Sequence, residues 1–366
     1  MNHKICFFNR SAVHYRIGIY KILSKELNVD FFFGDKRPGG IKGIDYKVLH
    51  TFKGLFKNVD IGPLYWQKGV FKSLLGKYTD VITTGDTYCL SSWFFLLLAP
   101  LFHEKVYLWT IGAMGGEKRL ERFIIRIKSF LTAGTMVYGE RAKKLLIDYG
   151  VNPKKICVIY NSLDYDEQIK LRKTMSKSNI YKNHFQNDNY NIVFIGRLVP
   201  RRKIEMLIEA ASKLKIKGLS VNVTIIGDGP VKESLVKTAE TFHFDTLWLY
   251  GALYDEVMIS DFLYNADLVV SPGSMGLAAM HALTFGCPII THDNFNNLGP
   301  ECEAIIRGVN GDQFVENDVN SLSSTIEKWF IEHPDREAVR LACYKIIDEK
   351  YNPHNQISII KSFIIK

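Results

Sequence analysis

The sequence of 366 residues lacks any apolar run long enough to cross a membrane as a helix. Its longest such run, residues 93–102, falls short of the roughly 20 residues that a spanning helix needs, and Pro100 interrupts it. The opening residues, MNHKICFFNR, also lack the features of a secretory leader. We therefore expect no signal peptide and no membrane-spanning helix, and we interpret residues 93–102 as a buried helix.

Cysteine is also scarce. The six cysteines form no Cys-x-x-Cys pair and are too few for a disulfide framework, which favours a reducing compartment and predicts a cytoplasmic protein.

No Asp-x-Asp motif stands at the end of a predicted strand in the second half of the chain. The sequence therefore implies no metal and no cofactor.

Positive charge is concentrated in the first half. Residues 1–165 hold 25 of the 47 Lys and Arg but only 13 of the 38 Asp and Glu, so their net charge is about +12 against about −3 for residues 166–366. Such a surface is either simply solvated or contacts anionic lipid or a phosphate-bearing substrate. Nucleic acid is a third anionic partner, but it is the least expected one because no nucleic-acid motif accompanies the charge.

Continuous apolar runs recur in the second half, and segments of helix length separate them. Such runs, rich in β-branched residues, are typical of parallel strands that are buried on both faces. They are NIVFIG (191–196), VNVTIIG (221–227), LWLYG (247–251), LVVSPG (268–273) and PIITHD (288–293). The alternation predicts an α/β fold with a doubly wound sheet.

The first half shows the same alternation less cleanly, so we predict two Rossmann-like domains in series. The polar, Asn-rich residues 176–190 are interpreted as the linker between them. The first domain then covers residues 1–175 and the second covers residues 191–345. The tail, residues 346–366, is predicted to form an amphipathic helix.

Glycine-rich turns follow most strands of the second domain. Ligands of open α/β sheets bind at the carboxyl ends of the strands, where backbone N–H groups are free. The turns are GRLVPRRK (196–203), GDGP (227–230) and PGSMGL (272–277), and the first carries several cationic side chains. Together they predict a cationic, amide-lined site suited to a diphosphate.

At this point the sequence resembles the group 1 glycosyltransferases, which are retaining enzymes of the GT-B fold. The resemblance is carried by FIGRL, IIGDGP, ADLVVSPG, FGCPII and EAIIRGVNG within residues 190–315, and more loosely by NRSAVHYR in the first half. It implies two domains that face each other across a cleft, with the C-terminal helix crossing back to the first domain. It also implies transfer of a sugar from a nucleoside diphosphate to a glycan or lipid-linked acceptor, as in bacterial surface polysaccharide biosynthesis, with possible contact to the inner face of the membrane.

The resemblance also assigns site residues. Arg197, with Arg202 or Lys203, would stabilise the charge on the departing diphosphate. The family has lysine at the position of Arg202, so Lys203 is an alternative second cation. His14 and Arg16 would bind the acceptor. The donor-binding residues would be Gly196, Gly227, Asp228, Gly229, Gly273, Ser274, Met275, Gly276, Leu277, His281 and Glu303.

Three further positions depart from the family pattern. Gly273 and His281 stand where the family usually has two glutamates, and Ile111 stands where it tends to have histidine. Backbone N–H groups of residues 274–276 would then hold the donor, while His281 either binds one ribose hydroxyl or packs beneath its helix. These departures keep two alternatives open: a nucleotide-sugar-binding protein without activity, and a GT-B-fold epimerase or hydrolase of nucleotide sugars.

Overall fold

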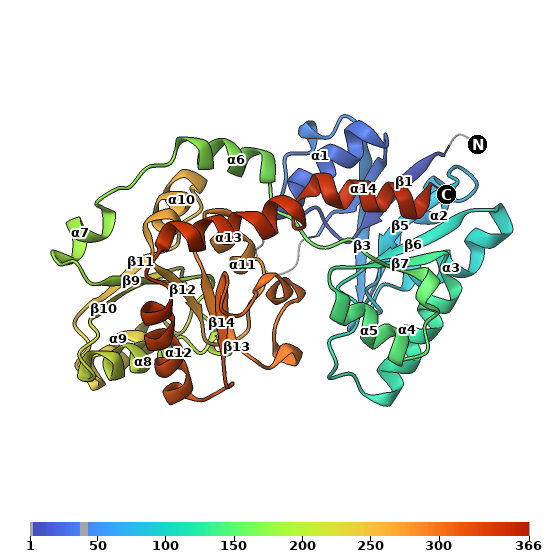
Figure 1. The fold of residues 1–366 in the computed structure, drawn as a ribbon. Coiled ribbons are helices and arrows are strands. Elements are labelled where there is room, and N and C mark those ends of the chain that lie inside the picture. The colour runs from blue at the N-terminus through green and yellow to red at the C-terminus, as the bar shows by residue number, and fades with distance from the viewer. Residues whose placement is uncertain (1–2, 37–42, 366) are drawn as a thin grey trace. The chain divides into compact units, whose positions relative to one another are not determined.

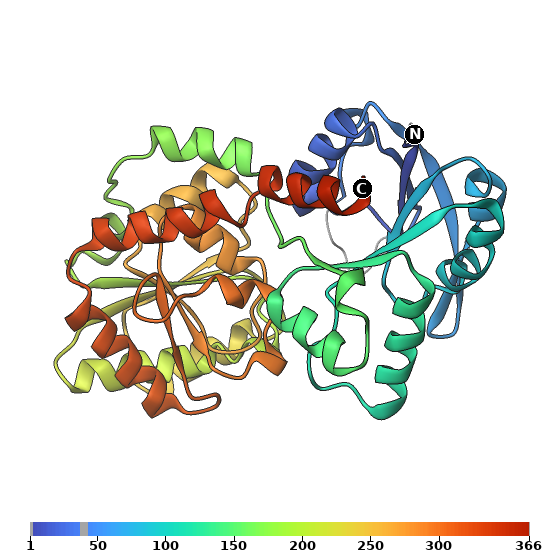
Figure 2. The same ribbon diagram turned by 45° about the vertical axis from the view of Figure 1, so that its right-hand side comes forward.

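The structure, a computed structural model, describes residues 3–36 and 43–365. It consists of two compact units (Figures 1 and 2). Unit 1 comprises Met1–Tyr165 together with Asn352–Lys366, and unit 2 comprises Asp166–Tyr351. Each unit is built around its own β-sheet, in agreement with the α/β fold expected from the sequence.

Unit 1 contains an eight-stranded sheet in the order β4-β3-β2-β1-β5-β6-β7-β8. All neighbouring strands are parallel except β3 and β4, which form an antiparallel hairpin at one edge. The strands are β1 (Ile5–Asn9), β2 (Asp30–Gly34), β3 (Phe52–Ile61), β4 (Leu64–Lys68), β5 (Asp80–Thr84), β6 (Lys105–Trp109), β7 (Gly134–Val137) and β8 (Ile156–Val158).

Both faces of this sheet are buried beneath helices. On β1, Phe7 belongs to the core on one side, whereas Cys6 and Phe8 belong to the core on the other, as the two-residue period of a strand requires. The helices are η1 (His14–Arg16), α1 (Ile17–Glu26), η2 (Tyr46–Val48), α2 (Val70–Leu74), α3 (Leu90–Leu98), η3 (Ala99–Phe102), α4 (Arg119–Leu131), α5 (Glu140–Asp148), η4 (Pro153–Lys155) and α14 (Pro353–Ile364).

Residues 93–102 form helical structure, in α3 and η3, but the prediction that they are buried throughout is wrong. Phe95, Leu96 and Ala99 are buried, whereas Phe94, Leu97 and Leu101 are exposed. A helix that packs against a sheet buries only one of its faces, so a segment that is apolar all round still leaves apolar side chains in solvent.

The C-terminal helix α14 belongs to unit 1, as the family resemblance implied. Ile357, Ile360 and Ile364 are buried in the same core as Phe7. Each such side chain contributes roughly 1.5–3 kcal/mol by leaving water. The helix starts at Pro353, later than the predicted residue 346, and the side chain of Asn352 caps it by accepting a hydrogen bond from the Asn355 amide at 2.9 Å.

Unit 2 contains a six-stranded, wholly parallel sheet in the order β11-β10-β9-β12-β13-β14. Five of its strands, β9 to β13, correspond closely to the apolar runs of the sequence. The strands are β9 (Tyr190–Ile195), β10 (Val221–Ile226), β11 (Leu247–Gly251), β12 (Leu268–Ser271), β13 (Ile289–His292) and β14 (Gly311–Phe314).

Helices cover both faces of the unit 2 sheet, which is therefore doubly wound. In Figures 1 and 2, α8, α9 and α12 lie on one face, and α10, α11 and α13 lie on the other. The helices of this unit are α6 (Tyr165–Thr174), α7 (Ile180–Phe185), η5 (Pro200–Arg202), α8 (Glu205–Ile216), α9 (Lys232–Thr241), α10 (Glu256–Asn265), α11 (Ala278–Thr284), η6 (Phe295–Asn297), η7 (Pro300–Ala304), α12 (Val319–Glu332) and α13 (Arg336–Glu349).

The boundary between the units lies at Tyr165 and Asp166, whereas the sequence predicted a linker over 176–190. That segment contains α7, and it is anchored in unit 2. Tyr181 is buried and its hydroxyl donates a hydrogen bond to the Phe262 carbonyl at 2.7 Å. A polar, Asn-rich composition therefore did not distinguish a linker from a short helix held by one buried aromatic side chain.

Across the described ranges 3–36 and 43–365, none of the helices combines the length and the apolar character needed to span a bilayer.

Candidate functional site

The strand order of unit 2 places a switch point between β9 and β12. From β9 the chain proceeds outward through β10 and β11, and then returns to add β12, β13 and β14 on the other side. The connections that leave β9 and β12 therefore diverge, and the carboxyl ends of these two strands border the crevice in which ligands of such sheets bind.

Glycines allow the loops at this edge to approach each other closely. A Cβ added to Gly227 would lie 1.8 Å from the Gly196 carbonyl oxygen, and one added to Gly229 would lie 2.3 Å from the Leu198 carbonyl oxygen. The Leu198 amide also donates to the Asp228 carbonyl at 2.9 Å. The turns after β9 and β10 are thus packed backbone against backbone, and any side chain on Gly227 or Gly229 would force them apart.

Gly273 makes a similar contact between the loops that follow β9 and β12. A Cβ on Gly273 would lie 2.2 Å from the Arg201 carbonyl oxygen, and the Ser274 amide donates to that same oxygen at 3.0 Å. The Arg202 guanidinium also donates to the Ser274 carbonyl. These contacts fix the turn after β12 against the cationic segment after β9.

Several polar groups around this contact have no partner among the residues that the structure describes. Nε of Arg202 and Oγ of Ser274 are buried without a hydrogen bond, and burial lowers the pKa of Arg202, as does, to a smaller extent, the charge of Arg201. Arg197 is exposed at the end of β9. A Cβ on Gly196 would lie 3.9 Å from Cζ of Arg202, so this guanidinium lies beside the strand end that leads to Arg197. Two cations and an unused hydroxyl at a switch point can bind an anion.

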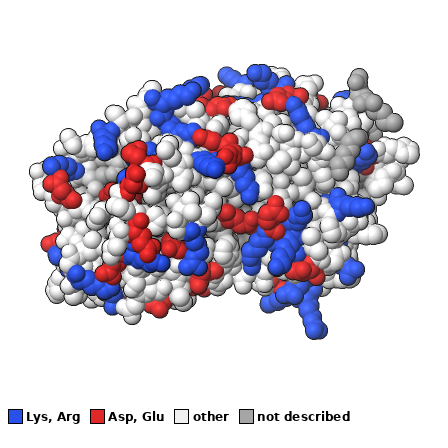
Figure 3. All heavy atoms as spheres, viewed as in Figure 1, with Lys and Arg blue, Asp and Glu red and all other residues white. Residues whose placement is uncertain are grey.

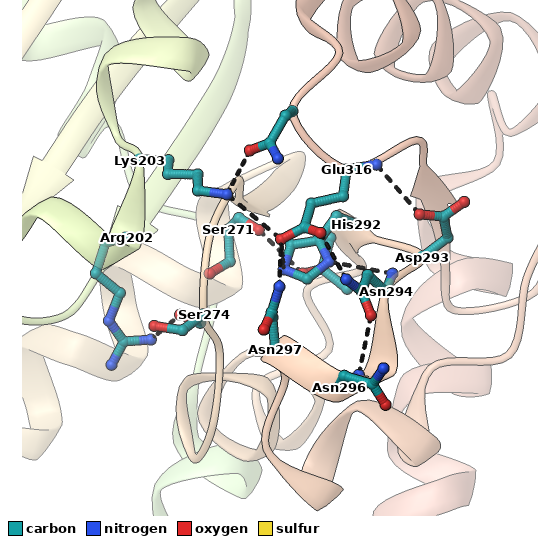
Figure 4. Close-up of polar contacts among 12 residues, drawn as sticks. Arg202, Lys203, Ser271, Ser274, His292, Asp293, Asn294, Asn296, Asn297 and Glu316 are labelled. Carbon is teal, nitrogen blue, oxygen red and sulfur yellow. Dashed lines mark hydrogen bonds and ion pairs between the residues drawn. The ribbon is translucent and has the colours of Figure 1, made fainter. Parts of the chain in front are cut away.

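Lys203 points away from this group, toward the ends of β13 and β14 (Figure 4). Its ammonium lies 3.3 Å from Oε1 of Glu316 and also contacts Asn317. The Glu316 carboxylate accepts further hydrogen bonds from Asn294 at 2.6 Å and Asn297 at 2.8 Å. These hydrogen bonds lower the pKa of Glu316 to about 2.

His292 completes this network at the end of β13. It is fully buried, its Nδ1 accepts a hydrogen bond from the Asn294 amide at 3.2 Å, and its Nε2 lies 4.0 Å from Oε1 of Glu316. Burial lowers the pKa of His292, against a smaller opposing effect of Glu316. Because Nδ1 accepts a hydrogen bond, the neutral imidazole carries its proton on Nε2, on the side of the carboxylate.

The family assignment rests on sequence comparison. Residues 175–345 match the family described as "Glycosyl transferases group 1". Within these residues, which make up most of unit 2, the chain belongs to the group 1 glycosyltransferases. A Klebsiella pneumoniae protein described as an uncharacterized 41.2 kDa protein in the cps region is 26% identical to this glycosyltransferase over 301 residues, which cover 80% of the chain and 74% of that relative.

Solved structures support the fold of the glycosyltransferase. Anabaena Alr3699/HepE in complex with UDP aligns with a TM-score of 0.73 at 15% identity, covering 99% of this chain and 100% of that one. The apo form of the lipopolysaccharide outer core galactosyltransferase WaaB aligns with a TM-score of 0.71 at 15% identity, covering 98% and 99% of the two chains. Both cover the two units, so the whole chain has the GT-B fold.

The donor loop of the glycosyltransferase is the turn after β12, residues 272–277. The structure changes which of its backbone amides are expected to bind the donor. The sequence predicted that amides of residues 274–276 would hold the donor, but the Ser274 amide is already bound to Arg201. The amides of Met275 and Gly276 donate to no residue in the described ranges, so they remain suited to that role. Leu277 directly precedes α11 and is half-buried.

His281 lies on α11 and faces the first residue of α10. Its Nε2 is 3.3 Å from Oε1 of Glu256, and the same oxygen accepts a hydrogen bond from Gln168 at 2.7 Å. His281 is thus placed beside a carboxylate, although its own position lacks the glutamate that is usual in the family. No local pattern predicts this pairing, because Glu256 is 25 residues away in the chain.

Of two glutamates in η7, the structure places Glu301 against the donor loop. Its Oε2 would lie 3.8 Å from a Cβ on Gly276, and the neighbouring Gly299 amide donates to the Met275 carbonyl at 2.6 Å. Glu301 is buried, whereas the predicted donor contact, Glu303, is half-buried. The role of Glu303 stays a prediction, and Glu301 was given no role from the sequence.

The predicted acceptor residues lie in unit 1, on η1. His14 is exposed, and Arg16 lies with its guanidinium carbon 5.5 Å from the centre of the Tyr138 ring. Nε of Arg16 is buried and has no hydrogen-bond partner within the described residues. Ile111 is exposed after β6. Acceptor binding by His14 and Arg16 stays a prediction.

Within the described part of the chain, no group of three or more metal-ligating side chains is present.

We expect Glu316→Gln to destabilise unit 2 at neutral pH because Lys203 loses its anionic partner. An ordinary glutamate has a pKa of about 4.3, and in the folded protein that of Glu316 is lowered to about 2. The ionised carboxylate therefore stabilises the fold above about pH 4.3, and this advantage disappears as the pH falls toward 2. Thermal unfolding of parent and variant should differ at pH 7 and converge between pH 4 and pH 2. A constant difference across this range would contradict the assignment.

Proposed function

We propose that this chain transfers a sugar, with retention of anomeric configuration, from a nucleoside diphosphate sugar to a glycan or lipid-linked acceptor. The observation that carries the proposal is a set of groups at the β9–β12 switch point that have no partner among residues 3–36 and 43–365. They are the Arg197 side chain, Nε of Arg202, Oγ of Ser274 and the amides of Met275 and Gly276. All of them are hydrogen-bond donors, and two carry positive charge, which matches a diphosphate.

In the proposed reaction, the bond between the sugar C1 and the diphosphate oxygen breaks, and both electrons leave with the diphosphate. The acceptor hydroxyl oxygen forms the new bond to C1 on the same face, and its proton passes to the departing phosphate. Negative charge grows on the diphosphate as the bond lengthens. Arg197 and Arg202 are already placed to interact with that charge, and such preorganised groups contribute most in the transition state.

In this proposal the second cation is Arg202 rather than Lys203. Lys203 is bound to Glu316 and Asn317, and it ties the loop after β9 to the loop after β14. Because Lys203 directly follows Arg202 in the chain, these contacts also hold Arg202 in position. We also propose that these cations hold the diphosphate without a divalent metal, as the lack of an Asp-x-Asp motif at the strand ends predicts.

The substrate class is supported by what related proteins are said to do. The Klebsiella relative is encoded in a cps region, WaaB is a lipopolysaccharide galactosyltransferase, and the Anabaena structure contains UDP. We therefore propose a role in bacterial surface polysaccharide biosynthesis at the cytoplasmic side of the membrane, with a uridine diphosphate sugar as the first donor to test.

A series of nucleotides tests the site directly. If two arginines hold a diphosphate, UDP should raise the unfolding temperature more than UMP, and uridine should have little effect. A ligand present at about one hundred times its Kd stabilises the folded protein by about 2.7 kcal/mol. GDP and ADP in the same assay identify the preferred base. Equal stabilisation by UMP and UDP would show that the second phosphate is not bound by these groups.

Turnover separates the proposed activity from its alternatives. UDP release from UDP-sugars is measured with and without a membrane lipid extract as acceptor, and NMR reports the anomeric configuration of the product. We expect release that depends on acceptor and that a chelator does not affect. UDP binding without release would indicate a non-catalytic binding protein, whereas release or isomerisation of the sugar without acceptor would indicate a hydrolase or an epimerase.

A further inference from the structure

Helix α4 in unit 1 exposes an apolar face to solvent. The side chains of Leu120, Phe123, Ile127 and Phe130 are 68%, 59%, 37% and 76% exposed. Their spacing of three or four residues places them in one stripe along the helix. A helix at the surface of a globular domain ordinarily turns such a stripe toward the core, so this face lacks the partner that its composition requires.

The opposite side of α4 buries a lysine. Lys128 is 2% exposed, and its ammonium donates to the Asp86 carbonyl at 2.6 Å and to Oγ of Ser92 at 2.9 Å. Burial lowers the pKa of Lys128 to about 8, which reflects the cost of keeping its charge there. The contacts to Asp86 and Ser92 fix the orientation of the helix. Phe123 and Phe130 are therefore exposed because of the way in which α4 packs.

A line of arginines runs beside the apolar stripe. Arg119, Arg122 and Arg126 follow one another at spacings of three and four residues, and none forms an ion pair with a carboxylate in the described ranges. Arg122 instead donates to the Glu117 carbonyl at 2.8 Å and lies 5.0 Å from the centre of the Tyr149 ring. Figure 3 shows Lys and Arg side chains gathered over the region of unit 1 where Figure 1 places α4 and α5.

Helix α3 and the turn η3 add further exposed apolar side chains next to α4. Ser92 and the Trp93 ring, 5.2 Å from the Lys128 ammonium, connect α3 to α4. On α3 and η3, Leu97 and Leu101 are exposed. Two neighbouring helices therefore both present apolar side chains to solvent, in the half of the chain that carries the excess of positive charge.

We propose that the exposed face of α4, with its apolar stripe and its arginines, docks on the surface of an anionic lipid bilayer. Amphipathic helices that lie in the plane of a membrane insert Leu and Phe among the acyl chains and place Lys and Arg against the headgroups. Leu120, Phe123, Ile127 and Phe130 would insert, and Arg119 and Arg126 would contact lipid phosphates. This surface lies outside the donor site, so the inference does not depend on the proposed reaction.

Charge favours a bilayer over a second copy of the chain as the occupant of this face. In a two-fold dimer the same surface meets itself, which would bring the arginine line of one copy close to that of the other. An anionic lipid surface offers negative charge to all three arginines at once. Exposed charge pairs are screened within about 10 Å at 0.1 M salt, so this attraction is sensitive to ionic strength.

Vesicle sedimentation with the full chain tests the proposal. Vesicles of phosphatidylcholine with about one quarter phosphatidylglycerol are compared with vesicles of phosphatidylcholine alone, at low and high salt. We expect binding to the anionic vesicles that weakens as salt rises, and much weaker binding to the neutral ones. Binding that ignores both lipid charge and salt would overturn the role of the arginines.

Matched variants test the helix face itself. Phe123→Ser with Phe130→Ser should weaken binding about tenfold or more because two exposed rings no longer enter the bilayer. Arg119→Gln with Arg126→Gln should weaken it about 25-fold, at about fivefold for each basic residue, and should reduce the salt dependence. Ile216→Asp with Ile331→Asp is the control, because both isoleucines are exposed but lie in unit 2.

All substituted side chains are exposed, so the variants should unfold at the parent temperature, which circular dichroism checks. Unchanged vesicle binding by the phenylalanine variant would overturn the proposal. A second outcome would also overturn it: the parent binds no vesicles and is a dimer in analytical ultracentrifugation, whereas the phenylalanine variant is a monomer. A second copy of the chain would then cover this face.

Discussion

Arg197→Ala is expected to lower kcat/KM about 100-fold or more and to leave the unfolding temperature unchanged. The Arg197 side chain is exposed and makes no hydrogen bond or ion pair with the described residues, so the fold does not depend on it. Its charge would interact with the diphosphate most strongly as the glycosidic bond breaks and negative charge grows on the leaving group. Removing one preorganised donor of this kind typically costs about 2.7–4 kcal/mol in the transition state. Steady-state kinetics with the donor identified by the nucleotide series measure the effect.

Two further variants make this prediction specific. Arg197→Lys should recover only part of the activity because lysine keeps the charge but loses the planar, bidentate fork. Arg307→Ala removes another exposed arginine from the same unit. Its ion pair with Asp312 is of the kind that contributes little, so this variant should behave like the parent. If Arg197→Ala folds normally and turns over within about threefold of the parent, the diphosphate binds elsewhere.

Gly273→Ala is expected to destabilise the protein by about 1–3 kcal/mol, the range typical of overpacked sites. The added Cβ would lie 2.2 Å from the Arg201 carbonyl oxygen and 2.6 Å from the Arg202 carbonyl carbon. These are backbone atoms, so no side-chain rotation relieves the overlap. The turn after β12 would have to move, which breaks the hydrogen bond from Ser274 to Arg201 and displaces the amides of Met275 and Gly276. Denaturant unfolding measures the loss, and UDP affinity should fall with it.

Gly276→Ala is the matched control for stability. It lies in the same turn, but the nearest atom to an added Cβ is Oε2 of Glu301 at 3.8 Å, an ordinary contact distance. We expect its unfolding free energy to stay within about 0.5 kcal/mol of the parent. A Gly273→Ala variant as stable as this control would mean that the two loops are not held as closely as described. In that case, close packing of the two loops would not explain why position 273 holds glycine instead of the glutamate that is usual in the family.

Local sequence patterns were enough to predict much of unit 2. Its buried strands are continuous apolar runs, and the glycines after β9 and β10 mark turns that indeed require close backbone approach. The hairpin of β3 and β4 was missed because most of the side chains of β3 are not buried, so its sequence lacks an apolar run. In the same way, β14 was missed because its sequence, GDQF, looks polar.

The details of the site depend on contacts between distant residues, which a single sequence does not reveal. Lys203 and Glu316 are 113 residues apart, and only the fold shows that this pair leaves Arg202 as the cation facing Ser274. The occupied amide of Ser274 depends likewise on the approach of the loop after β9. Sequence reasoning found the residue types that a diphosphate requires, but not which of them are already engaged.

Helix α14 has a consequence for the order in which the two units form during synthesis. Unit 2 is continuous in sequence, so all of its strands and helices have been made before Asn352 is added. Unit 1 is discontinuous, and the core around Phe7 includes Ile357, Ile360 and Ile364 from the last residues of the chain. On the ribosome, unit 1 therefore has an incomplete core until α14 has been made, whereas all the residues of unit 2 are already present by then.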